Sequence, residues 1–252
     1  MTSRPSALAS DLRLRIVVLV AMTCAACADI NAGDPAPTML SAAETRDVGW
    51  DPAGLDAAVE HARSLGTDAL IIVTDGKVVR SIGDVTKRRS VHSVRKALLS
   101  AIVGQHVGPG ARQIDLDATL ADLDIDDAPI PLTPLQREAT VLHLIRSVSG
   151  INHPAAAEAG MAREKNRRLG QGENQPGTVW AYNNWDYNAL TTIFETRTGL
   201  SVADAFETGI AERIGMQDFS TWSVSYSRRP RASRHRAAMF KMSFTVAPNR
   251  TI

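Results

Sequence analysis

Two short clusters of reactive side chains stand out in this sequence. In the first, Ser93 and Lys96 are three residues apart at the start of a predicted helix, so they share one face of its first turn. The positive end of the helix dipole stabilises negative charge at the serine oxygen, and a lysine removed from water can accept the serine proton. The pair therefore suggests nucleophilic catalysis by Ser93. A surface lysine one turn from a helix-capping serine is the other interpretation.

The second cluster is Tyr182-Asn183-Asn184. In an extended segment, residues two apart point the same way, so Tyr182 and Asn184 can face one cleft. A phenol can relay a proton, and a carboxamide can hold the amide or carbonyl of a substrate. An aromatic core corner is the alternative interpretation, and it is the one that we adopt for Trp185 and Tyr187.

A helix and a two-stranded hairpin are predicted before the serine. Asp51-Pro52 supplies a capping carboxylate and a proline at the first helical position, and this helix is expected to reach about residue 64. The β-rich run 68–74 and its partner 78–82 are joined by Asp75-Gly76, a typical hairpin turn. A two-stranded hairpin is not stable alone, so further strands should come from the C-terminus, where the sequence does not obviously supply them.

The pattern after the hairpin is helical. The helix that starts near Ser93 is predicted to bury the stripe Val94, Ala97, Leu98, Ala101 and Ile102. Further helices are predicted at about residues 115–121, 140–148, 185–198 and 202–214.

Together the two clusters resemble the serine β-lactamase/penicillin-binding-protein superfamily, in which Ser-x-x-Lys at a helix start is followed by a Tyr-x-Asn loop. The similarity is greatest to the class C-like, β-lactamase-related serine hydrolases. It extends over roughly residues 48 to 242, and the stretches that carry it are 92–100, 116–123, 141–151, 176–184 and 211–218.

The resemblance implies acyl transfer through a covalent intermediate. Ser93 would be the nucleophile, Lys96 and Tyr182 would share the general-base and general-acid roles, and Asn184 would orient the substrate. The backbone N–H of Ser93 would supply half of an oxyanion hole, worth roughly 3 kcal/mol per donor in well-studied enzymes. The implied substrate is a small molecule or peptide with an ester, amide or lactam bond, and no cofactor or metal is expected.

The resemblance also implies the fold class, an α/β (α+β) protein of the β-lactamase/transpeptidase-like kind. An antiparallel sheet flanked by helices would be joined to a helical subdomain. The third family motif is Lys-Thr-Gly or His-x-Gly on a strand near the C-terminus. No Lys-Thr-Gly occurs in the sequence, and no His-x-Gly follows residue 218. We therefore expect a C-terminally truncated member with an incomplete sheet and doubtful activity. A non-catalytic remnant or a protein that binds peptidoglycan fragments is the alternative.

The first residues are predicted to direct export. Basic residues precede the apolar run 16–22, and small residues follow it. Residues 1–28 are expected to be a signal peptide, cleaved before Asp29, or a lipoprotein leader with Cys27 as the lipidated residue. The expected location is the bacterial periplasm, or a membrane anchored only through lipid at Cys27.

The expected organisation continues with a linker at 29–48 and a partial family domain at 49–242. That domain divides into a sheet part at 49–92 and a helical part at 93–218, and an atypical tail follows at 243–252.

Composition excludes several other classes of protein. The 252 residues carry 28 Lys+Arg and 27 Asp+Glu, a net charge of +1, which argues against a strongly basic nucleic-acid-binding protein. With two cysteines, a disulfide framework and a cysteine-based zinc site are both excluded. The acidic run around Asp122-x-Asp124-x-Asp126 lacks the glycine of a calcium loop, and we interpret it as a solvated surface. The basic cluster at 228–236 lacks interleaved aromatics and is interpreted as a surface loop.

Overall fold

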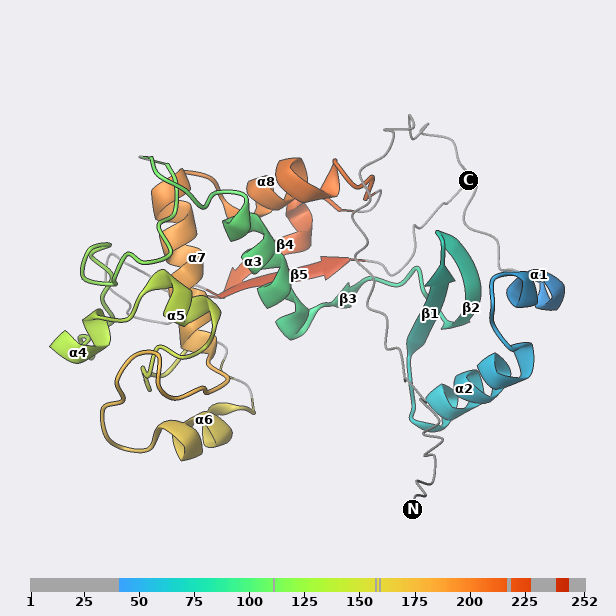
Figure 1. The fold of residues 1–252 in the computed structure, drawn as a ribbon, viewed down its shortest axis with the longest axis horizontal. Helices are drawn as coiled ribbons and strands as arrows, with labels where there is room; N and C mark the ends of the chain where they lie inside the picture. The colour runs from blue at the N-terminus through green and yellow to red at the C-terminus, as the bar shows by residue number, and fades with distance from the viewer. Residues whose placement is uncertain are drawn as a thin grey trace, which may run out of the picture. The chain divides into compact units, whose positions relative to one another are not determined.

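The computed structural model describes residues 41–110, 112–156, 158, 160–216, 219–227 and 239–244 (Figure 1). The predicted leader, the N-terminal part of the predicted linker and the basic cluster at 228–236 lie outside these residues. The helices are α1 (Ala42–Asp47), α2 (Pro52–Ser64), α3 (Arg95–Gly104), α4 (Pro134–Arg137), α5 (Val141–Ile145), α6 (Ala162–Leu169), α7 (Asn184–Thr198) and α8 (Val202–Phe206). The strands are β1 (Ala69–Thr74), β2 (Lys77–Gly83), β3 (Arg89–Ser90), β4 (Val224–Ser227) and β5 (Met239–Phe244).

The N-terminal elements form as their local signals predict. The Asp51 carboxylate caps α2 by accepting a hydrogen bond from the Gly54 N–H at 2.9 Å. β1 and β2 pair antiparallel across Asp75 and Gly76, which have φ values of +50° and +75°. Both positive φ angles match the turn that joins twisted strands with a two-residue loop. α2 packs against β2, and its buried side chains include Leu55 and, one turn later, Val59.

The end of the predicted linker is helical instead of irregular. Ser41 and Glu44 form a reciprocal capping box at the start of α1, and Thr45 is fully buried. This short helix has no apolar stripe, so hydrophobic periodicity could not reveal it. Its signal was the Ser-x-x-Glu spacing, which satisfies two backbone N–H groups at a helix start.

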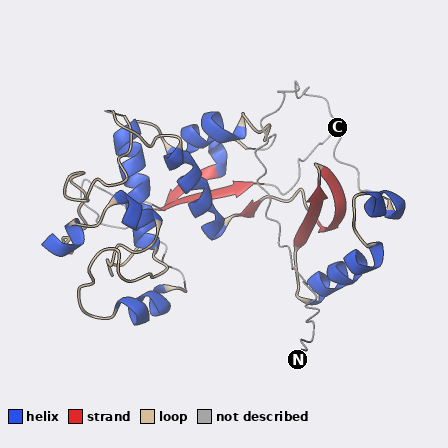
Figure 2. Ribbon diagram, in the orientation of Figure 1, coloured by secondary structure: helices blue, strands red, loops and turns tan. Residues whose placement is uncertain are grey.

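The described strands make two separate antiparallel sheets, drawn in red in Figure 2. One is the β1–β2 hairpin, and in the other the order is β3-β5-β4. Further strands do come from the C-terminus, as expected, although the sequence did not show them plainly: β4 and β5 both follow residue 218, and they pair with β3 instead of the hairpin. β5 pairs Ser243 with Ser90, three residues before Ser93, and it crosses the expected start of the atypical tail. Strands this short carry a weak sequence signal.

The helical core surrounds α7, labelled in Figure 1, and α3, α5 and α8 pack against this helix. The predicted α7 is confirmed, with Gly199 in the left-handed conformation at its end. The largest fully buried side chains are Trp185, Phe194, Phe206, Leu99, Ile102, Ile114, Leu120, Leu144, Ile151, Leu190 and Ile193.

The predicted buried stripe of α3 was only partly correct: Ile102 is buried and Leu98 packs against the core, whereas the other three members are exposed. Val94 is 61% exposed, whereas Leu99, Ile102 and Val103 are buried together with Lys96. The larger aliphatic side chains remove more apolar area from water than the alanines at 97 and 101, so they determine which face turns inward. Lys96 lies on this inward face.

The predicted helix at 115–121 was also wrong. The Asp115 carboxylate accepts a hydrogen bond from the Asp117 N–H at 2.9 Å, and Thr119 forms an isolated bridge with Thr140. Turn-forming aspartates offer the backbone an alternative to helical hydrogen bonds. The predicted helix at 140–148 is shortened to α5, and the one at 202–214 consists of α8 followed by a π-helical turn at Glu207–Ala211.

Candidate active site

Ser93 lies in a single 3₁₀ turn, His92–Val94, immediately before α3. The preceding His92 has a φ of +40°, a conformation that costs free energy for a residue with a side chain. Ser93 is exposed, while the next two side chains, Arg95 and Lys96, are 4% and 6% exposed. The hydroxyl therefore faces solvent beside two buried cations.

Lys96 joins the two sequence clusters. Its Nζ donates hydrogen bonds to Tyr182 Oη at 2.8 Å and to Asn184 Oδ1 at 2.6 Å, and it lies 3.4 Å from Ser93 Oγ. Tyr182 Oη in turn donates to Ser93 Oγ. All four residues singled out from the sequence therefore meet at one ammonium group, whose three N–H bonds each have an acceptor. A proton can pass between Ser93, Tyr182 and Lys96 through direct hydrogen bonds.

The surroundings lower the pKa values of both candidate bases. Burial is the main cause that lowers the pKa of Lys96, and the neighbouring charge of Arg95 adds to it against an opposing hydrogen bond to Tyr182. Burial by itself would raise the pKa of Tyr182. The hydrogen bonds of Tyr182 with Lys96 and Ser93 outweigh that effect, together with the positive charges of Lys96 and Arg95. The pKa of Tyr182 is therefore lowered. A lowered pKa on each group makes its deprotonated form more accessible near neutral pH.

Asn183, between Tyr182 and Asn184, holds this segment in place through hydrogen bonds to the protein interior. The side chain of Asn183 is 1% exposed, and its Nδ2 donates hydrogen bonds to the Ile151 carbonyl at 2.8 Å and to Asp186 Oδ1 at 2.9 Å. Its Oδ1 accepts a hydrogen bond from the Trp185 N–H and so caps the start of α7. Ser149 Oγ also donates to Asp186 Oδ1, at 2.6 Å. Because Asn183 points inward, Tyr182 and Asn184 are held on the outward side.

Asp186 is fully buried, and its Oδ2 has no hydrogen-bond partner among the described residues. Burial raises the pKa of this carboxyl well above 3.8, against the opposing effects of Ser149 and Lys165. The folded state therefore holds a proton that the unfolded chain releases as the pH rises above the ordinary carboxyl range. The contribution of the neutral carboxyl to the free energy of unfolding is fully present below the ordinary carboxyl pKa. This contribution is lost as the pH rises towards and through the pKa of the folded state.

We accordingly expect Asp186→Asn to become progressively more stable than wild type as the pH rises from 4.5 to 8. Urea unfolding at several pH values measures the difference. Asp122→Asn is the matched control, because the pKa of that exposed carboxyl is lowered by hydrogen bonds to Thr119 and its effect should not vary over this range. A pH-independent difference for Asp186→Asn would show that this carboxyl is ionised in the folded protein.

Sequence reasoning missed several residues around this cluster. The Tyr187 ring centroid lies 5.3 Å from Lys96 Nζ, and its hydroxyl donates to the Ile145 carbonyl at 2.9 Å. Its predicted core role is only partly correct, since it is half-buried beside the reactive lysine, whereas Trp185 is 1% exposed as expected. The position of Tyr187, one helical turn after Asn184, was the available signal. Nothing local distinguished Arg95, Ser149 or Asp186.

Among the described residues, no three His, Cys, Asp or Glu side chains are placed to hold a metal ion. In the acidic run, Asp122 bonds Thr119 and Asp126 pairs with Arg137. No helix in the described ranges is long and apolar enough to cross a membrane.

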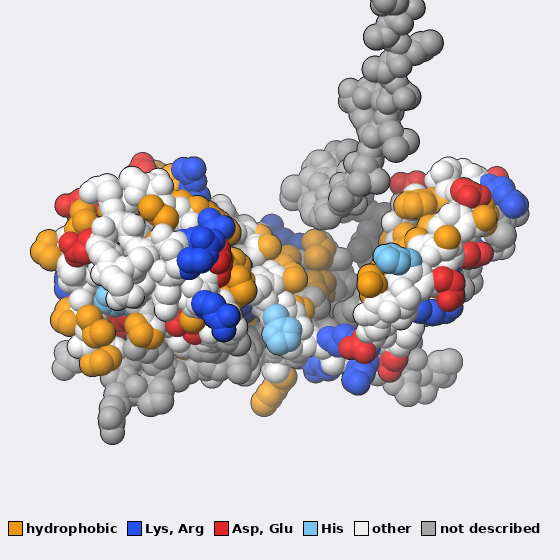
Figure 3. All heavy atoms as spheres, turned by 90° about the horizontal axis from the view of Figure 1, so that it is seen from below, with side chains coloured by type: hydrophobic (Ala, Val, Ile, Leu, Met, Phe, Trp, Pro, Cys, Tyr) orange, Lys and Arg blue, Asp and Glu red, His pale blue; other side chains and the backbone are white. Residues whose placement is uncertain are grey.

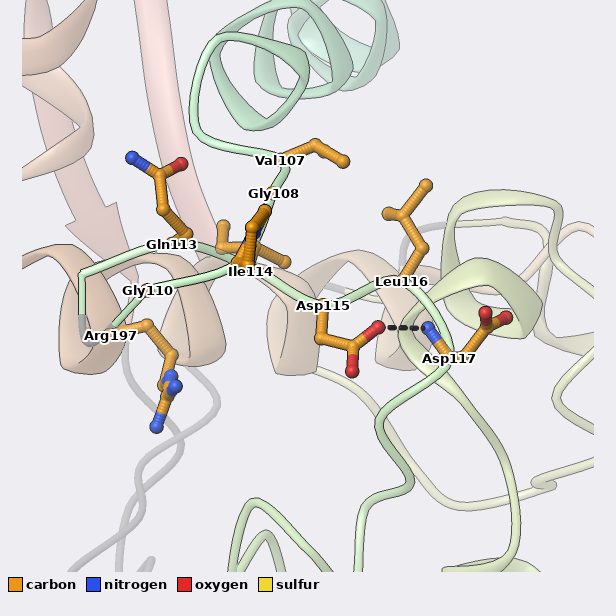
Figure 4. A pocket seen from close by; sticks show the side chains of 10 residues that line it. Val107, Gly108, Gly110, Gln113, Ile114, Asp115, Leu116, Asp117 and Arg197 are labelled. Atoms are coloured by element: carbon orange, nitrogen blue, oxygen red, sulfur yellow. Dashed lines mark hydrogen bonds between the residues drawn. The ribbon is translucent and has the colours of Figure 1, made fainter.

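A cavity of about 560 Å³ lies at the other end of α7, beside Arg197 and the loop from Val107 to Asp117 (Figure 4). Asn184 and Arg197 are separated by 13 helical residues, about 20 Å at 1.5 Å per residue, so this cavity is distinct from the Ser93 cluster.

Comparison with known proteins gives three kinds of match. The family model described as Beta-lactamase matches residues 55–250.

A D-aminopeptidase from Gluconobacter oxydans (strain 621H) is 30% identical over 121 residues, covering 43% of this chain and 21% of that protein. The octameric penicillin-binding protein homologue from Pyrococcus abyssi superposes with a TM-score of 0.51 at 18% identity, over 78% of this chain and 54% of that one. A crystal structure of SurE with D-Leu gives a TM-score of 0.46 at 21% identity, over 74% and 42% of the two chains. The chain thus spans about a fifth to a half of the length of these proteins.

Proposed function

This chain belongs to the β-lactamase family and has a β-lactamase/transpeptidase-like fold, and from that premise we propose that it is a serine hydrolase acting through a covalent acyl-enzyme. The observation that carries the proposal is the hydrogen-bonded cluster of Ser93, Lys96 and Tyr182. A serine, a buried lysine and a phenol in direct contact form an activated nucleophile with its base.

The proposed reaction begins when the cluster loses one proton, so that Ser93 Oγ–H can donate to Tyr182 Oη. Ser93 Oγ then attacks the substrate carbonyl while its proton passes to Tyr182 or Lys96. The backbone N–H of Ser93, near the positive end of α3, would stabilise the developing oxyanion. Tyr182 delivers the proton to the departing group, and water later releases the acyl group from Ser93. Asn184 would contact the substrate amide or carbonyl.

The substrate is proposed to be a small molecule or peptide containing an ester, amide or lactam bond, and the protein is proposed to act after export. The D-aminopeptidase match favours a peptide-like substrate. The second candidate function is non-catalytic binding of peptidoglycan fragments. It is favoured by the sequence after residue 218, which contains neither Lys-Thr-Gly nor His-x-Gly, since a motif there would border a second oxyanion donor.

The test is active-site labelling of residues 29–252 with a fluorophosphonate and with a penicillin, followed by intact-mass measurement. We expect one adduct per chain, located on Ser93 by peptide mapping and absent in Ser93→Ala. Ser100→Ala is the matched control, because Ser100 lies on the same helix and its hydroxyl instead donates to the Lys96 carbonyl. A folded, unlabelled protein that binds muropeptides would support the second candidate and overturn the first.

A further inference from the structure

An exposed tryptophan lies beside the proposed general acid. Trp180 is 51% exposed, whereas Ala181 and Asn183 are 2% and 1% exposed. Asn183 has extended backbone angles, φ −129° and ψ 114°, and burial alternates along this segment. Trp180 therefore projects to the same side as Tyr182, about 6.5–7 Å along the chain. The indole is thus two residues from a member of the Ser93 cluster, on the same side of the segment, and half of its surface is open to solvent.

The guanidinium of Arg168, on α6, lies over this indole at 5.1 Å from the ring centroid. Its Nε donates to Glu164 Oε1 at 2.7 Å, and Arg167 binds both oxygens of the same carboxylate. These bonds lower the pKa of Glu164 to about 2, so the carboxylate is charged at neutral pH. The carboxylate of Glu164 and the guanidinium groups of Arg167 and Arg168 together carry a net charge of +1.

The remaining N–H donors of Arg168 determine what kind of ligand the surface around Trp180 can bind. Within the described ranges, its two terminal nitrogens, Nη1 and Nη2, bond to no acceptor. A guanidinium whose plane is fixed by an aromatic ring and by a carboxylate is preorganised to bind an anion. Figure 3 views the molecule from the side on which α6 lies in Figure 1, and Lys and Arg side chains gather over that part of the surface.

We propose that Trp180 and Arg168 form the subsite for the departing group, and that this subsite selects leaving groups carrying a carboxylate next to an aromatic or apolar body. The inference rests on the proposed function, in which Tyr182 protonates the departing group. That group must contact Tyr182, and Trp180 is the next side chain on the same side. The apolar body would lie on the open part of the indole, and the carboxylate would reach the terminal nitrogens of Arg168.

Two aryl esters with the same acyl group test this selection: 3-carboxyphenyl acetate and its neutral counterpart 3-carbamoylphenyl acetate. In each, Ser93 Oγ forms a bond to the acetyl carbon, the ester C–O bond breaks, and the serine proton ends on the phenol oxygen. Water then converts acetyl-Ser93 to acetate. We expect kcat/KM to favour the carboxylate ester about tenfold, as one charge-assisted contact at a partly exposed site allows. The preference should fall as salt is added.

Arg168→Gln should bring the ratio of the two kcat/KM values close to one, and Trp180→Ala should lower kcat/KM for both esters. Deacylation should be unchanged in both variants, because the acetyl-enzyme is the same. Arg163→Gln is the matched control, because it removes one exposed charge from the same helix. Labelling of Ser93 by a small fluorophosphonate, which lacks the carboxylate, should proceed at the wild-type rate in Arg163→Gln and should still reach one adduct per chain in the other two variants.

The outcomes separate the two proposals. A ratio of one in the wild type, or a tenfold ratio that survives Arg168→Gln, overturns the subsite while Ser93 labelling still supports the hydrolase. Loss of preference in Arg163→Gln as well would assign the effect to the general charge of α6, and this also overturns the subsite. Absence of Ser93 labelling overturns the hydrolase and the subsite together.

Discussion

Replacing Lys96 by methionine is expected to slow acylation of Ser93 by roughly 10²–10⁴-fold, the usual contribution of a positioned general base. Methionine retains much of the buried side-chain volume but removes the group that contacts Ser93, Tyr182 and Asn184. Serine at its ordinary acidity is a weak nucleophile, so the fluorophosphonate adduct should form far more slowly. The rate of adduct formation by intact mass gives the ratio directly.

The pH dependence of the same variant provides a second readout. In the wild type, burial and Arg95 lower the pKa of Lys96, and Lys96 helps to lower that of Tyr182, so acylation should rise with pH below the ordinary range of either group. Without Lys96, the hydrogen bond and charge that lower the pKa of Tyr182 are lost. The residual reaction of Lys96→Met should therefore require higher pH.

The control is Lys77→Met, the same change at an exposed lysine of β2. It should retain the wild-type rate and pH profile. A folded Lys96→Met protein that acylates within about threefold of wild type would remove Lys96 from the mechanism, because a general base is worth far more than that. Tyr182 alone would then have to serve as the base.

Replacing Phe194 by alanine is expected to lower the free energy of unfolding by about 3–5 kcal/mol, the usual cost of deleting a fully buried phenylalanine ring. Phe194 is 0% exposed on α7, and its ring meets that of His106 edge-on at 5.2 Å between centroids. The cost combines lost apolar burial with the cavity that remains. Urea denaturation with fluorescence detection measures the change.

Trp222→Ala is the matched control for this prediction. The ring of Trp222 is 91% exposed, so deleting a larger side chain there should change stability by less than about 0.5 kcal/mol. A cost below about 1 kcal/mol at Phe194 would contradict the packed core around α7, because a site that collapses so easily is loosely packed. α7 begins at Asn184, a residue of the site. A large loss of unfolding free energy in Phe194→Ala would therefore also show that packing of the C-terminal half of α7 stabilises the helix that carries Asn184.

Local signals in the sequence were sufficient for much of the architecture. Asp51-Pro52 located the start of α2, Asp75-Gly76 located the hairpin turn, and Thr198-Gly199 located the end of α7. Each works because a capping group or a positive φ angle depends on a few consecutive residues. For the same reason, the spacing of Ser93 and Lys96 was enough to predict that the two residues lie close together where α3 begins.

Tertiary structure decided everything that joins distant segments. It brings Lys96 within 2.8 Å of Tyr182, 86 residues later, and turns that lysine inward with the larger aliphatic residues of α3. It also decided the pairing of β3 with β5 and the stacking of Arg168 on Trp180. Burial, strand pairing and desolvation depend on which surfaces meet after folding, and residues so far apart in the chain carry no local pattern that records such a meeting. The sequence by itself therefore determined the candidate nucleophile and its partners, whereas packing alone decided their contact, their lowered pKa values and the aromatic, cationic surface beside them.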